Sequence, residues 1–233
     1  MKKLVALLSI LILSSCAELQ SVVDNLPNQT GIDNATIASG LRQALDFGIE
    51  KQVTKLTQKD GFYGNSLVKI LLPEELQKVD QTLRNVGLSS LADEGLKVLN
   101  RAAEDAVSEA TPIFVDAVKG ITFADAKTIL LGADDSATTY LQTKTSTQLY
   151  DKFNPVIKSS FIKVGADQIW SNLITKYNAL PLTNDVNPDL TDYVTQEALK
   201  GVYTMIAVEE KEIRTDFSAR TTTLLKKVFA LQD

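Results

Sequence analysis

The sequence predicts an all-α fold: a single domain of about seven to nine helices that follows a signal peptide and a short polar tether. Three observations predict it. Apolar residues recur at steps of three and four, glycines and prolines separate these stretches, and capping residues stand where several of them begin. The composition, 44% hydrophobic and 23% charged, is that of a globular protein. A body of about 200 residues is long enough for one substantial core.

The first sixteen residues have the pattern of a secretory leader. Lys2 and Lys3 precede an apolar run over 4–13, which is too short to cross a bilayer as a helix. The run ends in Leu13-Ser14-Ser15-Cys16, which resembles the bacterial lipobox, whose cysteine is acylated. The alternative is an ordinary signal peptide that happens to contain a cysteine. We expect a lipoprotein signal peptide over 1–15, which is cleaved, because the chain has one cysteine and it stands at the end of the apolar run.

The predicted lipid sets the expected location. Residues 16–33 are polar, carry Pro27 and Gly31, and are predicted to be a tether between the lipid on Cys16 and the helical domain over 34–233. Ala17 follows the cysteine where an aspartate would retain a lipoprotein at the inner membrane, by resemblance to enterobacterial sorting. We therefore expect a lipid-anchored protein of the outer membrane with its body in the periplasm. Without the leader's two lysines, 22 basic residues stand against 29 acidic ones, a net charge of −7.

The first half of the body divides into five predicted helices. An apolar stripe predicts a helix over 34–59, and Asp60-Gly61 ends it. A loop with a short apolar stretch follows over 62–72. Pro73 suits the first turn of the next helix, which Gly87 ends. A long helix is expected from 89 to about 110, with a break or restart at 112 and an end before 120. Thr122 and Asp125 form a capping-box pattern for a short helix.

The second half continues the same pattern. Asp134-Asp135-Ser136 is expected to begin a helix that runs toward Pro155, where a new helix covers about 156–178. The last two helices are expected over 189–214 and 217–231, after a loop marked by Pro181 and Pro188.

Arg101 and Glu104 are a candidate pair on the polar face of the helix over 89–110. They stand three residues apart, so their side chains can meet on a helix. One interpretation is a solvated, ion-paired face. The other is that a later helix covers this face and makes Arg101 a buried anchor or a ligand hook.

The helix over 189–214 carries two more candidate carboxylates. Glu209 falls inside its apolar arc and Glu210 lies at the edge of that arc. Glu210 can pair with Arg214 one turn later, whereas Glu209 needs a partner from elsewhere, for which Arg220 and Arg101 are the candidates. A buried ion pair that fixes the packing of the helices is the favoured interpretation. The alternative is a carboxylate with a raised pKa that acts as an acid or base.

The composition excludes several classes of activity. The chain has no histidine, so it has neither a histidine-based catalytic triad nor a histidine-ligated zinc site. A pI near 4.9 argues against nucleic acid as a partner. No nucleotide-binding glycine motif and no G-x-S-x-G elbow occurs. We expect no catalytic residue, no cofactor and no metal.

Several short stretches together resemble the bacterial domain-of-unknown-function family numbered 4197, seen as predicted periplasmic lipoproteins. They include Asp60-Gly61-Phe62, Leu72-Pro73-Glu74, Asn100-Arg101-Ala102-Ala103-Glu104, Asp125-Ala126-Lys127 and Arg220-Thr221-Thr222. The resemblance runs from about residue 38 to the C-terminus. It implies a helical domain behind a lipoprotein leader, and it brings no assigned activity, cofactor or catalytic residue.

Three functions follow as hypotheses. The first is a non-enzymatic envelope protein that is anchored by the lipid and binds another protein or organises the envelope. The second is a carrier of an apolar or amphiphilic small ligand, which requires a closed cavity of several hundred Å³ near Leu199, Met205 and Ile206. The third is a hydrolase that uses Glu209 or Glu210, which requires two carboxylates, or a carboxylate and a metal, that converge in an open cleft.

Overall fold

The computed structural model describes residues 32–85, 87, 89–165, 167–168, 170–171, 174–175 and 189–233. These residues form helices, turns and loops without a strand, so the predicted all-α class is confirmed. The predicted signal peptide, the lipidation site Cys16 and nearly all of the tether lie outside the described residues. None of the described helices is long and apolar enough to cross a membrane.

The helix boundaries follow the predicted ones closely in the first half of the body. The helices are α3 (Asn34–Thr57), α4 (Glu74–Asn85), α5 (Ser89–Val107), α6 (Ala110–Lys119), α7 (Phe123–Leu130), α8 (Ser136–Lys163), α10 (Thr191–Thr215) and α11 (Thr223–Phe229), with a 3₁₀ turn, η1 (Phe217–Ala219), before the last.

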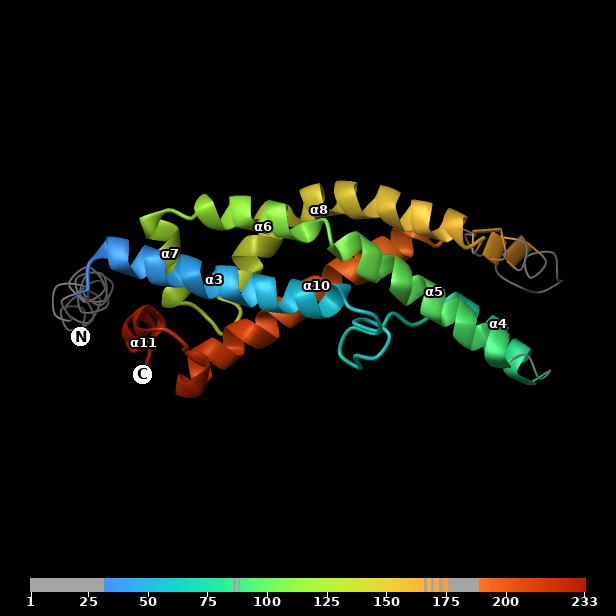
Figure 1. The fold of residues 1–233 in the computed structure, drawn as a ribbon, viewed down its shortest axis with the longest axis horizontal. Helices are drawn as coiled ribbons and strands as arrows, with labels where there is room; N and C mark the ends of the chain where they lie inside the picture. The colour runs from blue at the N-terminus through green and yellow to red at the C-terminus, as the bar shows by residue number, and fades with distance from the viewer. Residues whose placement is uncertain are drawn as a thin grey trace, which may run out of the picture.

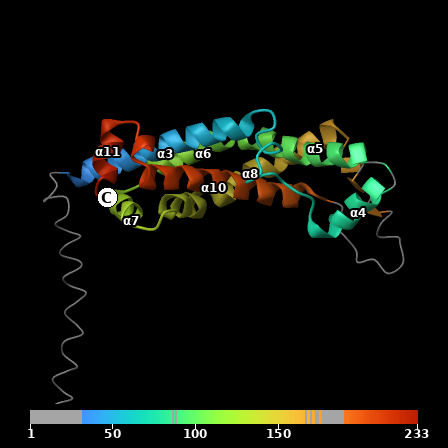
Figure 2. The same cartoon turned by 90° about the horizontal axis from the view of Figure 1, so that it is seen from below.

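The helices form an elongated bundle in which α3, α8 and α10 are the long members (Figure 1). Helix α10 packs against α8 and α3, and α5 packs against α8. The start of α3, α7 and α11 gather at one end, and α4 lies at the other, as both views show (Figure 2). The chain therefore enters the domain and leaves it at the same end.

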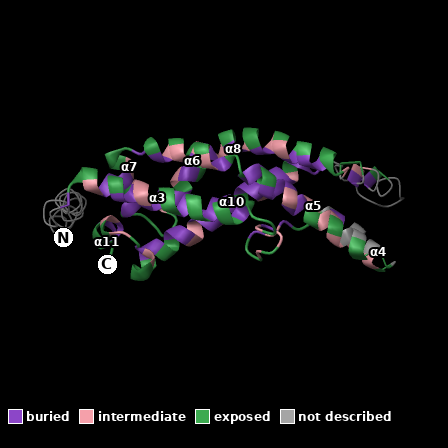
Figure 3. Ribbon diagram, in the orientation of Figure 1, coloured by how far each residue is buried: buried purple, intermediate pink, exposed green. Residues whose placement is uncertain are grey.

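The core lies along the sides at which the helices meet (Figure 3). The predicted stripe of α3 is confirmed, because all six of its apolar residues are buried: Ile37, Leu41, Leu45, Ile49, Val53 and Leu56. Helix α5 buries the alanines Ala102, Ala103 and Ala106, which are at most 1% exposed. Their small side chains let the neighbouring backbones come close.

The capping box before α7 is present. The Thr122 hydroxyl accepts from the Asp125 N–H at 3.1 Å, and the Asp125 carboxylate accepts from the Thr122 N–H at 3.0 Å. These bonds satisfy two backbone donors at the start of a short helix. They also lower the pKa of Asp125 below its ordinary value, because they favour the charged carboxylate.

The predicted break at Pro155 is wrong, because α8 continues through it to Lys163. Phe153 and Ile157, on either side of the proline, are fully buried. Their packing in the core outweighs the cost of about 3 kcal/mol that proline imposes inside a helix. Pro155 itself faces solvent.

The last predicted helix is divided. Instead of one helix over 217–231, the chain forms η1 and then α11. Asp216 caps η1 by accepting from the Ser218 N–H, and Thr222 caps α11 by accepting from the Leu225 N–H. Two successive caps of this kind start two short elements rather than one long helix.

Candidate functional site

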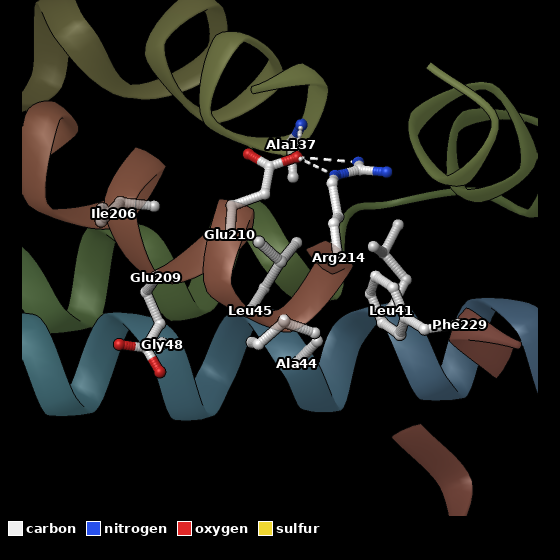
Figure 4. A pocket seen from close by; sticks show the side chains of 11 residues that line it. Leu41, Ala44, Leu45, Gly48, Ala137, Ile206, Glu209, Glu210, Arg214 and Phe229 are labelled. Carbon is white, nitrogen blue, oxygen red and sulfur yellow. Dashed lines mark hydrogen bonds and ion pairs between the residues drawn. The ribbon is translucent and has the colours of Figure 1, made fainter. Parts of the chain in front are cut away.

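The two candidate carboxylates of α10 point to opposite sides of the helix (Figure 4). Glu209 is directed toward Gly48 on α3, and Glu210 toward Ala137 at the start of α8. Each glutamate is 7% exposed. Neighbouring residues on a helix are about 100° apart, so two carboxylates in sequence reach different partners. They do not converge, and the geometry that the hydrolase hypothesis requires is absent at this pair.

Glu210 is held by five donor groups. It accepts from the Ala137 and Thr138 N–H groups and from the Thr138 hydroxyl, each at 2.8 Å. Arg214 adds its Nη2 at 2.8 Å and its Nε at 3.0 Å, so the pair predicted from the spacing is formed. The two backbone groups belong to the first turn of α8, where a negative charge is favourable. These bonds give Glu210 a structural role, because they hold α10 against the start of α8.

Arg214 and Arg220 bond carbonyl groups at the ends of two helices, Arg214 at the end of α7 and Arg220 at the end of α10. Arg214 donates to the carbonyl groups of Ile129 and Leu130 at the end of α7, at 2.8 and 3.0 Å. Arg220, 1% exposed, donates to the carbonyl groups of Ile213 and Arg214 at 2.9 and 2.8 Å. The two arginines thus supply donors to carbonyl groups that the helix ends leave unsatisfied.

Arg220 also forms an ion pair near the C-terminus. Its two terminal nitrogens contact the Asp233 carboxylate at 2.6 and 2.8 Å. This fork-like contact lowers the pKa of Asp233, because the hydrogen bonds from Arg220 favour the charged form.

Glu209 has a different partner from those predicted. Its oxygens lie 2.7 Å from Nζ of Lys51 and 2.6 Å from Nε2 of Gln52, both on α3. The expectation that Arg220 or Arg101 would meet it is wrong, because both arginines are engaged elsewhere. A Cβ on Gly48 would lie 3.2 Å from Cγ of Glu209, so the glycine leaves room for the carboxylate to reach α3.

The void between α3 and α10 is too small for a ligand. It measures about 20 Å³, room for one water molecule, and Ile206 and both glutamates line it. Leu199 and Met205 are 7% and 6% exposed, so their surroundings are packed. The closed cavity of several hundred Å³ that the carrier hypothesis requires is not found at these residues.

Arg101 and Glu104 form the predicted pair, but what covers them was not predicted. Glu104 is 5% exposed and also accepts from the Phe62 N–H at 3.2 Å. Arg101 remains about one-third exposed and contacts Asp60 at 2.8 Å. The covering element is therefore the segment over 60–73, which precedes α5 in the chain, and not a later helix.

Asn100 holds the same segment from the side of α5. Its side-chain oxygen accepts from the Ile70 N–H at 2.8 Å, and its nitrogen donates to the Ile70 carbonyl at 2.9 Å and to the Leu96 carbonyl at 2.8 Å. Asn100 is fully buried, and all three bonds are short and direct. The amide thus pairs with Ile70 as a neighbouring β-strand would.

Residues 60–73 border an open groove on the side of α10. It has a volume of about 640 Å³, with Leu67, Leu71 and Pro73 on one side and Tyr193, Glu197 and Thr204 of α10 on the other. A Cβ on Gly201 would lie 2.7 Å from the Phe62 ring, so this glycine lets the segment lie close to α10. Within the described residues this groove is the best candidate for a binding site, because Leu67 and Leu71 are 62% and 58% exposed in it.

Sequence reasoning missed Lys51, Gln52, Asn100 and Tyr193. Lys51 and Gln52 are separated from Glu209 by more than 150 residues, and no local pattern links them. The position of Asn100 could have indicated its role. Its short polar amide stands beside the alanine face of α5, and a buried amide must find hydrogen-bond partners.

Among the residues that the structure describes, no group of three or more His, Cys, Asp or Glu side chains could hold a metal ion. The family model described as "Protein of unknown function (DUF4197)" matches residues 31–230. Neither the curated proteins nor the solved structures include a match to the chain.

Proposed function

The chain belongs to the DUF4197 family of proteins of unknown function, and we propose that it is a lipid-anchored, non-enzymatic protein of the cell envelope that binds another protein. The observation that carries the proposal is a division within the domain. The buried carboxylates close on structural partners, whereas the groove beside α10 is open and presents exposed leucines.

The anchor part of the proposal rests on the leader. Cys16 ends a basic and then apolar leader at the position where the lipobox places its acylated residue. A diacylated cysteine supplies the more than one acyl chain that stable anchoring takes. Because α3 begins at the α11 end of the bundle, a lipid at Cys16 would attach at that end (Figure 1). The body would then extend away from the membrane, which we propose to be the outer membrane.

The proposed non-enzymatic, protein-binding role is supported by the partners and the exposure of the glutamate side chains. Glu209, Glu210 and Glu104 each have cationic or amide partners and little exposure, so none presents a free carboxylate to a substrate. A non-enzymatic role is favoured because the chain also lacks histidine, the commonest general base. Two exposed leucines in one groove are a surface that another protein chain can cover.

The test of the anchor is membrane fractionation of the Cys16→Ser variant. We expect the wild type in the outer-membrane fraction and the variant released from it, with the thermal unfolding midpoint of the body unchanged. A matched control adds Ser21→Cys to the Cys16→Ser variant; it restores the thiol but not its position and is expected to stay released. A variant that remains in the membrane fraction contradicts the lipid anchor.

A further inference from the structure

Exposed apolar side chains gather at the end of the bundle where α7 and α11 lie and where the chain enters the domain (Figure 2). Phe217 in η1 is 59% exposed, and Phe123 and Leu131, the first residue and the C-cap of α7, are 54% and 42% exposed. Five of the eight phenylalanines of the chain are at most 4% exposed. An exposed phenylalanine is therefore an exception in this protein, and two of the three exceptions lie at this end.

Lysine side chains stand beside this apolar surface. Nζ of Lys226 on α11 lies 5.2 Å from the centre of the Phe217 ring, so η1 and α11 present a cation and an aromatic ring side by side. Lys226 and the neighbouring Lys227 are both exposed. Phenylalanine and leucine next to lysine are typical of elements that lie in the interface between membrane and water, because the apolar groups enter the lipid while the ammonium groups stay among the headgroups.

The predicted tether would bring this end of the bundle to the membrane. Ile32, the first described residue, is buried, and α11 packs against the helix that follows it, so the chain enters the domain beside α11. Ile32 follows Cys16 by 16 positions, a length of chain that spans at most about 58 Å. A tether of this length holds its two ends at an effective concentration on the order of millimolar. Contacts from a few side chains, too weak to bind a free protein to lipid, can then suffice.

We propose that the α11 end of the bundle rests on a phospholipid surface, with its apolar side chains at the outer part of the acyl chains and its lysines at the phosphate groups. The contacting residues are Phe123, Leu131, Phe217, Lys226 and Lys227. The inference rests on the proposed lipid anchor, to which it adds a direct contact between the protein body and the lipid.

Carboxylates at the same end indicate which phospholipid fits. Asp134 and Asp135 stand between α7 and α8, Asp216 precedes η1, and all three are exposed. The chain as a whole is also acidic. An anionic lipid surface would repel these groups, whereas a zwitterionic one offers its phosphates to the lysines without a net negative charge. The surface we infer is therefore zwitterionic.

The experiment measures how close individual side chains lie to lipid in vesicles that carry the full-length, acylated protein. The chain has one cysteine, and acylation blocks its thiol, so an introduced cysteine is the single site for a fluorescent label. Phe217→Cys and Phe123→Cys place the label at the proposed contact. The matched controls are Phe47→Cys, on α3 and 45% exposed, and Leu71→Cys in the groove, 58% exposed. Label at position 217 leaves the core intact, because η1 buries none of its residues.

The vesicles contain phosphatidylcholine and phosphatidylethanolamine, with a nitroxide attached to some of the lipid near the headgroup. We expect this nitroxide to quench the labels at positions 217 and 123 at least twice as strongly as those at 47 and 71. Adding Phe217→Asp to the Phe123→Cys protein should reduce the quenching at 123 at least twofold, and adding Phe47→Asp should not.

Flotation of the same vesicles reports the anchor separately. Equal quenching at all four positions, in protein that floats with the vesicles, would overturn the contact and leave the anchor standing. Stronger quenching at position 71 than at 217 would likewise overturn it, since the opposite end of the groove-bearing bundle would then face the lipid. Protein that does not float would contradict the anchor and the contact together.

Discussion

The two halves of α10 differ in the burial and bonding of their side chains. Its C-terminal half carries Glu209, Glu210 and Arg214, all 7% exposed and all bonded to other helices. Its N-terminal half borders the groove, where Leu67 and Leu71 of the opposing segment over 60–73 are 62% and 58% exposed. The difference shows that the buried charged residues of α10 hold helices together, whereas the groove presents two exposed leucines among charged side chains on its rim.

The largest effect should follow Glu210→Ala. Arg214, whose side chain is 4% exposed, would lose its carboxylate, and two N–H groups of α8 would lose their acceptor. Breaking a buried pair on one side costs about 3–5 kcal/mol. Chemical denaturation measures this loss. Glu212→Ala in the same helix is the control, since Glu212 is 54% exposed and lies 3.8 Å from Lys51; it should change stability by less than about 1 kcal/mol. Equal losses of stability in Glu210→Ala and Glu212→Ala would contradict the structural role assigned to Glu210.

Asn100→Ala should cause the second largest loss of stability. It should loosen only the groove side of the domain. Both backbone groups of Ile70 would lose their partner inside the core, which costs about 2–3 kcal/mol. Hydrogen exchange should speed up over residues 62–73 and stay slow over 129–138. Asn154→Ala is the control, because its bonds are 3.3 and 3.4 Å long and it is only partly buried. Loosening of both regions together would mean that they are one cooperative unit.

Glu209→Ala should cost less than Glu210→Ala, about 1–3 kcal/mol. Its cationic partner Lys51 has a side chain 46% exposed and can return to water, so only Gln52 is left buried without a bond. The double variant Glu209→Ala with Gln52→Leu should recover part of the loss by removing that polar group. A loss as large as that of Glu210→Ala would show that Lys51 is not free to leave.

The smallest effect concerns pH. Because Arg220 lowers the pKa of Asp233 in the folded protein, the ionised pair contributes stability above the unfolded pKa, and that contribution is lost as pH falls through the lower, folded pKa. The difference in free energy of unfolding between the wild type and Asp233→Asn should therefore become smaller as pH is lowered below about 4. Urea denaturation at a series of pH values measures this gap. A constant gap would contradict the role of Asp233.

Local rules predicted much of the fold and part of the scaffold. The stripe of α3, the capping box before α7 and the pair of Glu210 with Arg214 all depend on residues within a few positions of each other, so periodicity and spacing suffice. Pro155 shows the limit, since the packing of its neighbours overrides a strong local preference.

Local sequence rules could not predict the candidate site. Glu209 meets Lys51 through the packing of α3 on α10, and the absence of a Cβ at Gly48 makes room for the contact. The pairing of Asn100 with Ile70 likewise depends on where a non-helical segment lies. Sequence periodicity says which face of a helix is buried, but it does not say which of several segments will cover it.

Site-specific photocrosslinking in living cells tests the division between the two halves most directly. A photoreactive amino acid replaces Leu71 in the groove or Phe217 at the other end of α10, positions that are 58% and 59% exposed in the native protein. We predict a discrete protein adduct from position 71 that Leu67→Asp abolishes, and none from position 217. Equal adducts from both positions, or an adduct from 217 alone, would contradict the assignment of partner binding to the groove.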